Sequence, residues 1–170
     1  MAKKKVYIYN DPVLRRKARP VNQISGTVRK LIEDMFETMD AGGGIGLAAP
    51  QVGVSKRIFV LDTRELGERL ACINPKIISS SKNDLCPYNE GCLSLPDMEA
   101  EVIRPRRVTL QYTSPDGEEV QVEADDMLAR VIQHEYDHLE GILFIDRVKS
   151  PRERRALVEE MNELEAVVHA

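Results

Sequence analysis

Apolar residues recur at helical spacing in the stretch TVRKLIEDMFETMDAGGG, which begins at Thr27. They form one apolar stripe, made of Val28, Leu31, Ile32, Met35, Phe36 and Met39. Ser25 or Thr27 can cap the start of this segment, and the glycines at 42–44 end it. The pattern predicts an amphipathic helix that buries one face.

The segments that follow are typical of strands. The apolar run RIFVLD at 57–62 predicts a buried strand, and LACINPKII at 70–78 predicts another, interrupted by Pro75. Residues 106–124 alternate between apolar and polar on both sides of the sequence Pro-Asp-Gly at 115–117. This turn chemistry between alternating runs predicts a β-hairpin.

Two more helices are expected toward the end of the chain. One is DMLARVIQHEYDHLEG at 126–141, with Asp125 or Asp126 as its cap and a glycine just past its end. The other begins at Ser150, which has capping-box spacing to Glu153 and precedes a proline suited to the first helical position. Its apolar positions, again at helical spacing, are Leu157, Met161, Leu164 and Val168.

Together these elements predict an α+β fold with mainly antiparallel strands packed around the helix at 126–140, plus an N-terminal and a C-terminal helix. We expect a single domain over residues 1–170, with a core at 1–148 and the C-terminal helix at 150–168. At this length the chain can bury a sizeable core.

Composition narrows the function classes. The net charge of −4 with 42% hydrophobic residues indicates an ordinary globular protein without nucleic acid as its main partner. Neither a membrane span of about 18 apolar residues nor a signal-peptide core is present in the sequence. Three cysteines are an odd number, which argues against a disulfide framework and favours a cytoplasmic location.

The stretch QHEYDHLEG at 133–141 carries the main chemical signal. On a helix His134 and His138 lie on one face, one turn apart, so both can direct a ring nitrogen at one metal ion. Glu135 then stands beside that ion, where it can take a proton from a bound water. In a chain with only three histidines this spacing favours a metal site over a chance pair.

The residues alone do not identify the third metal ligand. Glu140 and Asp146 follow the helix so closely that reaching back to the ion is awkward. Cys92 lies upstream next to a glycine, and its thiolate would be a strong ligand for iron or zinc. Taken alone, however, a free cysteine is more often a buried small hydrophobe, and Cys72 and Cys86 are interpreted that way.

The glycine-rich stretch GGGIGLAAPQVG at 42–53 lacks the pattern of a P-loop or a dinucleotide turn, so we expect no nucleotide cofactor. Its small residues would let a backbone edge lie against a peptide, with Gln51 presenting an amide. Met127 and Val131 share the helix face of the two histidines. They could line a groove with Ile45 opposite, or they could be ordinary core residues.

Three segments together resemble the bacterial peptide deformylases: GIGLAAPQ at 44–51, EGCLS at 90–94 and HEYDH at 134–138, in family order and separation. The similarity extends from DPVLRRKARPV at 11–21 to about Ile145. It implies removal of the formyl group from the N-terminal formyl-methionine of new polypeptides, with a metal-bound water as nucleophile. We also expect a monomer.

The resemblance assigns roles residue by residue. It implies Cys92, His134 and His138 as ligands of one Fe²⁺, with Zn²⁺, Ni²⁺ or Co²⁺ able to take its place. It implies Glu135 as general acid/base, with Gln51 and the backbone N–H of Leu93 as donors to the oxyanion. The substrate-binding residues that it implies are Ile45, Gly46, Glu90, Met127 and Val131.

Two other functions fit parts of the pattern. A metallopeptidase could use the same helix, although an upstream cysteine ligand and a small chain argue against it. A binding module with a structural metal would need four protein ligands, and the sequence offers three good candidates. The arginines of the last helix, Arg152, Arg154 and Arg155, suggest a possible contact with the ribosome, although a solvated face is the simpler interpretation.

Overall fold

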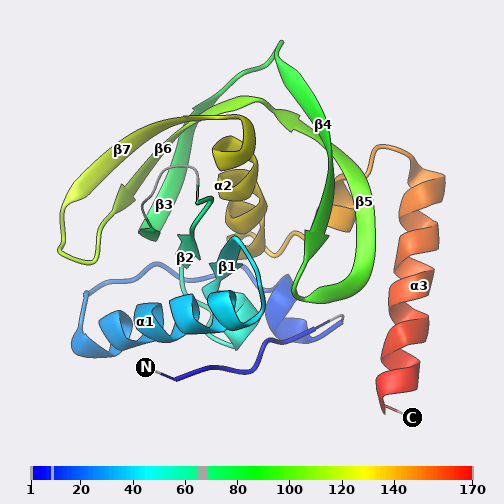
Figure 1. Ribbon diagram of the computed structural model, residues 1–170, viewed down its shortest axis with the longest axis horizontal. Coiled ribbons are helices and arrows are strands. Elements are labelled where there is room, and N and C mark those ends of the chain that lie inside the picture. The colour runs from blue at the N-terminus through cyan, green and yellow to red at the C-terminus, as the bar shows by residue number, and fades with distance from the viewer. Residues whose placement is uncertain (1, 9, 65–68, 170) are drawn as a thin grey trace.

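A computed structural model describes residues 2–8, 10–64 and 69–169, with only the backbone described for 165–169 (Figure 1). Its helices are α1 (Gly26–Ala41), α2 (Asp126–Leu139) and α3 (Pro151–His169), with short 3-10 helices η1 (Pro12–Arg15), η2 (Ala49–Val52) and η3 (Phe144–Arg147). Its strands are β1 (Gly46–Ala48), β2 (Ile58–Leu61), β3 (Leu70–Ser80), β4 (Leu85–Cys92), β5 (Leu95–Pro105), β6 (Arg107–Thr113) and β7 (Glu119–Asp125). The predicted α+β class is confirmed.

The strands form two sheets. Five of them make an antiparallel sheet in the order β1-β2-β3-β6-β7, and β4 and β5 make a separate antiparallel pair. Helix α2 lies between the two sheets and contacts strands of both (Figure 1). Among the helices that the structure describes, α2 is the one with a sheet on either side, and it carries both histidines.

Strand β2, an interior strand between β1 and β3, shows how the five-stranded sheet is packed. All four of its residues are buried. Phe59 and Leu61 pack in the cluster that contains α2, whereas Ile58 and Val60 pack in the cluster that contains α1. Because successive side chains of a strand point to opposite faces, a strand covered on both sides is apolar throughout.

A third cluster holds α3 against the β4–β5 side of the molecule. Met161 is buried, and Leu157 and Leu164 pack beside it against residues that include Leu95 and Met98 of β5. The predicted apolar spacing of the last helix is thus confirmed as far as Leu164. Val168 lies outside the side chains that the structure describes.

The structure decides three local predictions, namely the caps of α1 and α2 and the effect of Pro75. Ser25, not Thr27, caps α1, since its Oγ accepts a hydrogen bond from the N–H of Val28 at 3.3 Å. Asp125 is the N-cap of α2 but forms no side-chain capping bond. The expected break at Pro75 is wrong: β3 continues through it, with a register shift and Asn74 at φ 50°. A bulge of this kind lets a strand carry a proline.

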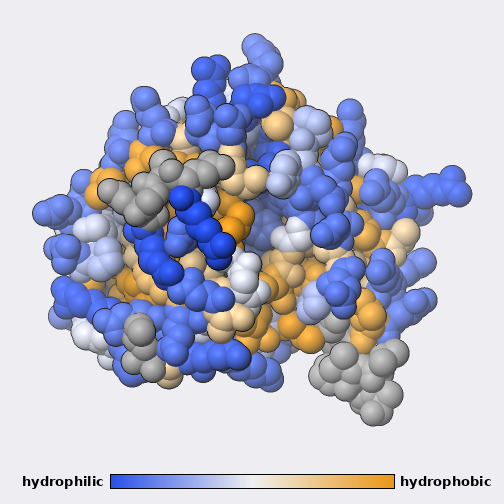
Figure 2. Space-filling model, viewed as in Figure 1, coloured by the Kyte–Doolittle hydropathy of each residue, from blue (hydrophilic) through white to orange (hydrophobic). Residues whose placement is uncertain are grey.

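Hydrophilic side chains cover most of the face seen in Figure 2, while hydrophobic side chains gather beside the hollow between α1 and the β4–β5 pair. Among the described residues, none of the helices combines the length and the apolar character needed to cross a membrane.

Candidate active site

The three predicted ligands come together between α2 and β4. Cys92 is the last residue of β4, and His134 and His138 lie one turn apart on α2. One ligand atom from each residue lies within 4.8 Å of the others, and the Cys92 Sγ is 3.4 Å from the His138 Nε2. Burial lowers the pKa of His138, which favours the neutral imidazole that binds a metal. Burial acts in the same direction on His134, but hydrogen bonds with Cys92 and Glu90 outweigh it and raise its pKa, so this imidazole must release a proton when a metal binds. One thiolate and two imidazoles suit a divalent ion such as iron or zinc.

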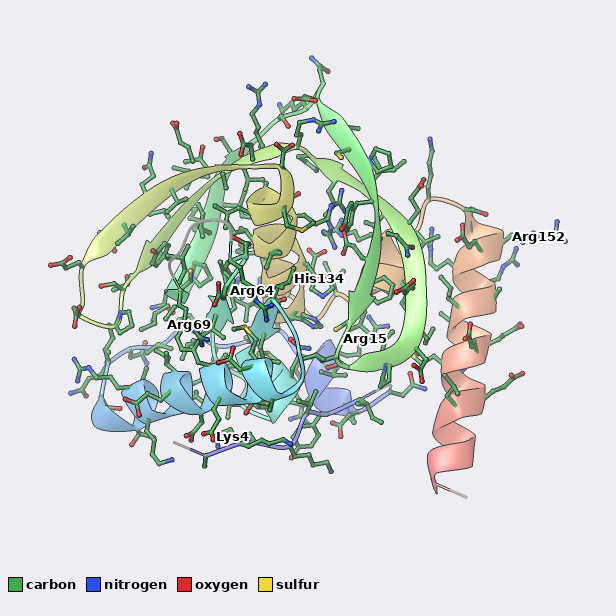
Figure 3. The ribbon with its side chains drawn as sticks, viewed as in Figure 1. Lys4, Arg15, Arg64, Arg69, His134 and Arg152 are labelled. Carbon is green, nitrogen blue, oxygen red and sulfur yellow. The ribbon has the colours of Figure 1, made fainter. Side chains whose placement is uncertain are left out.

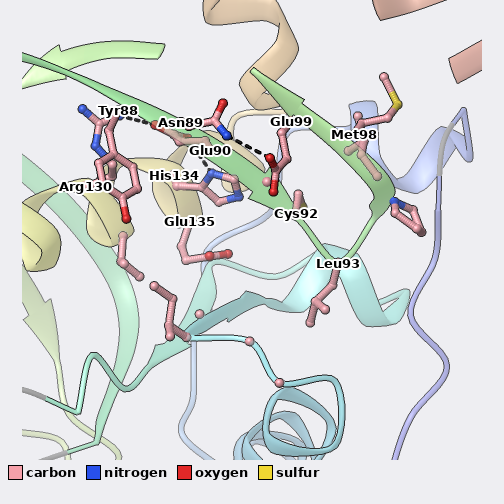
Figure 4. A pocket seen from close by; sticks show the side chains of 18 of the residues that line it. Tyr88, Asn89, Glu90, Cys92, Leu93, Met98, Glu99, Arg130, His134 and Glu135 are labelled. Carbon is pink, nitrogen blue, oxygen red and sulfur yellow. Dashed lines mark hydrogen bonds and ion pairs between the residues drawn. The ribbon is translucent and has the colours of Figure 1, made fainter. Parts of the chain in front are cut away.

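Glu90 fixes the orientation of His134 from the β4 side (Figure 4). Its Oε1 lies 2.8 Å from the His134 Nδ1, which leaves the Nε2 of that ring to face an ion. Its Oε2 accepts hydrogen bonds from Arg104 at 2.7 Å and from Arg130. Burial alone would raise the pKa of Glu90, but hydrogen bonds from His134 and Arg104 outweigh it and lower the pKa to about 2.

The surroundings of Glu135 differ from those of Glu90, and its pKa shifts in the opposite direction. It is buried, and its Oε1 has no hydrogen-bond partner among the described residues. Burial raises its pKa to about 7, against the nearby charge of His134. Gly46 of β1 lies against it, since a Cβ there would come within 2.5 Å of the Glu135 Oε2 and 2.9 Å of the Val131 side chain. Only glycine allows this approach of β1 to the helix.

Gln51 reaches the site from η2. Its Oε1 accepts the N–H of Ala48 at 2.9 Å, so its amide nitrogen faces the other way. That nitrogen lies 3.1 Å from the Ser94 Oγ and 3.5 Å from the Cys92 Sγ. Leu93 covers the glycine-rich loop from the other side, within 3.2 Å of where a Cβ on residue 42 would stand. The amide of Gln51 is therefore held beside the thiol.

All predicted site residues but one line a single groove of about 1080 Å³. The groove is lined by Gln51, Leu93, Glu135, Cys92, His134 and all five predicted substrate-binding residues, Ile45, Gly46, Glu90, Met127 and Val131. The exception is His138, which is buried and does not line the groove. The two carboxyl residues that seemed too close to the helix lie elsewhere: Glu140 pairs with Arg57 and Asp146 with Arg15.

The comparisons with known proteins agree with this geometry. A family model described as polypeptide deformylase matches residues 3–154. The chain belongs to the polypeptide deformylase family. It is therefore an enzyme of the peptide deformylase type, a metal-dependent hydrolase of protein biosynthesis, and the Cys92, His134 and His138 cluster could hold the metal.

Individual deformylases match most of the chain. The peptide deformylase of Pseudothermotoga lettingae is 48% identical over 159 residues, which is 92% of this chain and 91% of that one. A crystal structure of the Legionella pneumophila deformylase has a TM-score of 0.90 at 35% identity and covers 99% of this chain and 98% of its own. A class I type b deformylase from Acinetobacter baumannii, crystallised with Met-Ala-Ser bound, has a TM-score of 0.81 at 34% identity and covers 86% and 99%.

The sequence analysis assigned no role to the two arginines around Glu90: Arg104 matches a commonly basic position of the family, and Arg130 went unnoticed. Arg104 also donates to Asp137 at 2.9 Å, and Arg130 lies on α2 four residues before His134. Both are buried, at 4% and 6% exposure. A charged residue within the otherwise apolar segment that precedes QHEYDH was the signal that could have pointed to Arg130.

Proposed function

We propose that this chain removes the formyl group from the N-terminal formyl-methionine of newly made polypeptides and releases formate. The observation that carries the proposal is Glu135, a buried carboxyl with a free oxygen, beside the three-donor cluster in the groove. In the metal-free protein burial raises the pKa of Glu135 to about 7, which shows that its surroundings favour the protonated form needed of a group that accepts a proton and later donates it.

The cluster fits Fe²⁺ as the resident ion, with Zn²⁺, Ni²⁺ or Co²⁺ as substitutes, because a thiolate with two imidazoles binds all four. When bound, such an ion acts as a Lewis acid toward the formyl carbonyl and acidifies water in its open position. Metal analysis of protein purified without air tests the choice of ion.

The protein groups then handle the proton and the charge. Glu135 accepts the proton of the attacking water and passes it to the departing amine. Gln51 and the backbone N–H of Leu93 stabilise the oxyanion, and one such donor is typically worth about 3–4 kcal/mol. The bond from Ala48 keeps the Gln51 amide nitrogen turned toward the reacting centre. Glu90 holds the His134 ring in place.

The groove suits a methionine side chain. Val131 and the half-buried Met127 form an apolar wall on α2, and Ile45 stands in the glycine-rich loop. A flexible apolar side chain packs well against such a surface. Met-Ala-Ser, which the Acinetobacter baumannii relative binds, is the peptide that remains when formyl-Met-Ala-Ser loses its formyl group.

Formate release from formyl-Met-Ala-Ser by anaerobically purified protein tests the function. We expect release of one formate per peptide and no cleavage of unformylated Met-Ala-Ser. Cleavage of unformylated peptides would indicate a metallopeptidase instead. No formate release from protein that carries one metal ion per chain would refute the proposal.

We also propose a cytoplasmic monomer that meets its substrates near the ribosome through α3. Arg152 lies near the start of that helix and well away from His134 (Figure 3), whereas Glu160, about two turns further along α3, lines the groove. Ribosome co-sedimentation of the full chain and of a chain ending at Lys149 tests this contact. Equal co-sedimentation of both would refute it.

A further inference from the structure

The three proposed ligands depend on two different elements. Cys92 ends β4, whereas His134 and His138 belong to α2. The distance between the thiol and the imidazoles is therefore set by how firmly β4 is held against α2. A side chain that ties the two elements together can control the metal geometry without contacting the ion.

Arg130 of α2 makes such a tie. Its Nη2 donates to the carbonyl of Cys86 in β4 at 2.5 Å, and its Nη1 donates to the carbonyl of Val102 in β5 at 3.1 Å. The same Nη1 donates to the Oε2 of Glu90. One buried guanidinium thus connects the helix to two backbone positions and one carboxylate of the β4–β5 pair.

These contacts require arginine. A guanidinium presents several N–H groups in a rigid plane and can reach acceptors in different directions at once. A lysine ammonium could keep the charge near Glu90 but would not reproduce the fork to both carbonyls. Arg130 and His134 lie four apart on one helix face and share Glu90 as a partner. Hydrogen bonds therefore connect Arg130 to Glu90, and Glu90 to the proposed ligand His134.

Arg130 also lines the substrate groove. Its guanidinium lies over the ring of Tyr88, 5.4 Å from the ring centroid, and both residues line the groove (Figure 4). Tyr88 is 48% exposed, so its ring is accessible from the groove. A shift of Arg130 would therefore move the groove wall as well as Glu90.

We propose that Arg130 is a positioning residue that fixes β4 against α2, and thereby sets both the spacing of the three metal ligands and the shape of the groove at Tyr88. The effect on substrate rests on the proposed deformylase reaction. The effect on metal binding does not depend on that reaction.

The substitution Arg130→Met tests the proposal, because methionine keeps an apolar stem and loses every donor. We expect the dissociation constant for Co²⁺, measured against a competing chelator, to rise about ten-fold, the lower end of what outer partners of a metal ligand contribute. The visible absorption of the Co²⁺-loaded protein should change, and the KM for formyl-Met-Ala-Ser should rise several-fold. Arg130→Lys should recover part of the metal affinity through Glu90.

Arg106 offers a matched control. It also spans the two elements, with bonds to Asp84 just before β4 and to Asp126 at the start of α2, but its side chain is 40% exposed. Arg106→Met should leave the Co²⁺ dissociation constant, the absorption spectrum and KM within two-fold of the wild type.

A purely structural role for Arg130 gives a different result. In that case Arg130→Met would lower the free energy of unfolding but leave Co²⁺ affinity, spectrum and KM unchanged, and the proposal would be wrong. If Arg130→Met does not fold, Arg130→Lys serves in its place: wild-type metal affinity and KM in that variant would overturn the proposal, and a partial loss of both would support it. If the wild type released no formate, the proposed reaction would fail, whereas the Co²⁺ measurements would still decide the role of Arg130.

Discussion

Two glutamates in the same groove have opposite surroundings. Glu90 and Glu135 are both buried, at 5% and 4% exposure, and both lie beside His134. The oxygens of Glu90 accept hydrogen bonds from two arginines and lie against the histidine, and its pKa falls to about 2. Glu135 lacks these partners on one oxygen, and its pKa rises to about 7. Similar solvent exposure therefore accompanies an ionised carboxylate at Glu90 and a carboxyl of raised pKa at Glu135, which we propose as the anchor of His134 and the proton carrier, respectively.

The largest expected effect comes from removing the proton carrier. Glu135→Gln keeps the shape of the side chain but cannot accept a proton, so formate release should fall about 10³-fold, within the range typical of acid–base groups. The metal content should stay at the wild-type value, because Glu135 is not among the three residues that we propose as ligands. Turnover close to wild type in the metal-loaded variant would contradict the assignment.

The anchor should affect binding and stability instead. Glu90→Gln removes the charge that Arg130 and Arg104 face, which in a buried pair costs about 3 kcal/mol. It also loosens His134, so metal affinity should fall about 10–100-fold. Chemical denaturation and a chelator competition measure the two effects. Loss of turnover with full metal affinity would show that Glu90 takes part in the reaction itself.

The pH dependence of stability separates the two groups further. In metal-free protein the pKa of Glu135 is raised from 4.5 to about 7. Its contribution is therefore fully present below about pH 4.5 and is lost as the pH rises through 7, at a cost of about 3 kcal/mol. Glu135→Gln should remove this part of the pH dependence, measured as the free energy of unfolding from pH 4.5 to 8. The contribution of Glu90 has the opposite sign and is lost only as the pH falls toward 2.

An exposed ion pair should matter least. Asp84 pairs with Arg106 at 3.0 Å, and both side chains are about 40% exposed. Asp84→Asn should change the free energy of unfolding by less than about 1 kcal/mol, because solvent screens such pairs. A loss as large as that of Glu90→Gln would mean that burial is not what distinguishes the network at Glu90.

Regular periodicity explains which elements the sequence predicted. Helix α1 and strand β2 follow simple apolar patterns and were found at nearly their observed bounds. Strands β4 and β5 were missed. Strand β5 does alternate, with Met98, Ala100 and Val102 buried between the exposed Glu99 and Glu101, and this strand signal went unused. The buried position of β4 is Glu90, and Arg104 is buried near the end of β5; these two charged residues are shielded from solvent by pairing with each other. Such residues look like surface residues in a sequence.

The residues of the candidate site were predictable only in part from the sequence. The spacing of His134 and His138 on one helix indicated two ligands and a base, because that geometry is local. Cys92 joined them only through the family resemblance, since a distant strand end carries no periodic signal. The difference in pKa between Glu90 and Glu135 was not predictable from the sequence, because it depends on where Arg104 and Arg130 lie after folding.

The most direct test of this account is a titration of the two carboxyl groups themselves. In metal-free protein with ¹³C-labelled glutamate side chains, NMR spectra recorded from pH 3 to 9 report the ionisation of each carboxyl, and Glu90→Gln and Glu135→Gln assign the two signals. We predict a midpoint near pH 7 for Glu135 and no transition above pH 3 for Glu90. If both groups titrated near pH 4.5, the central claim that their surroundings separate an anchor from a proton carrier would be wrong.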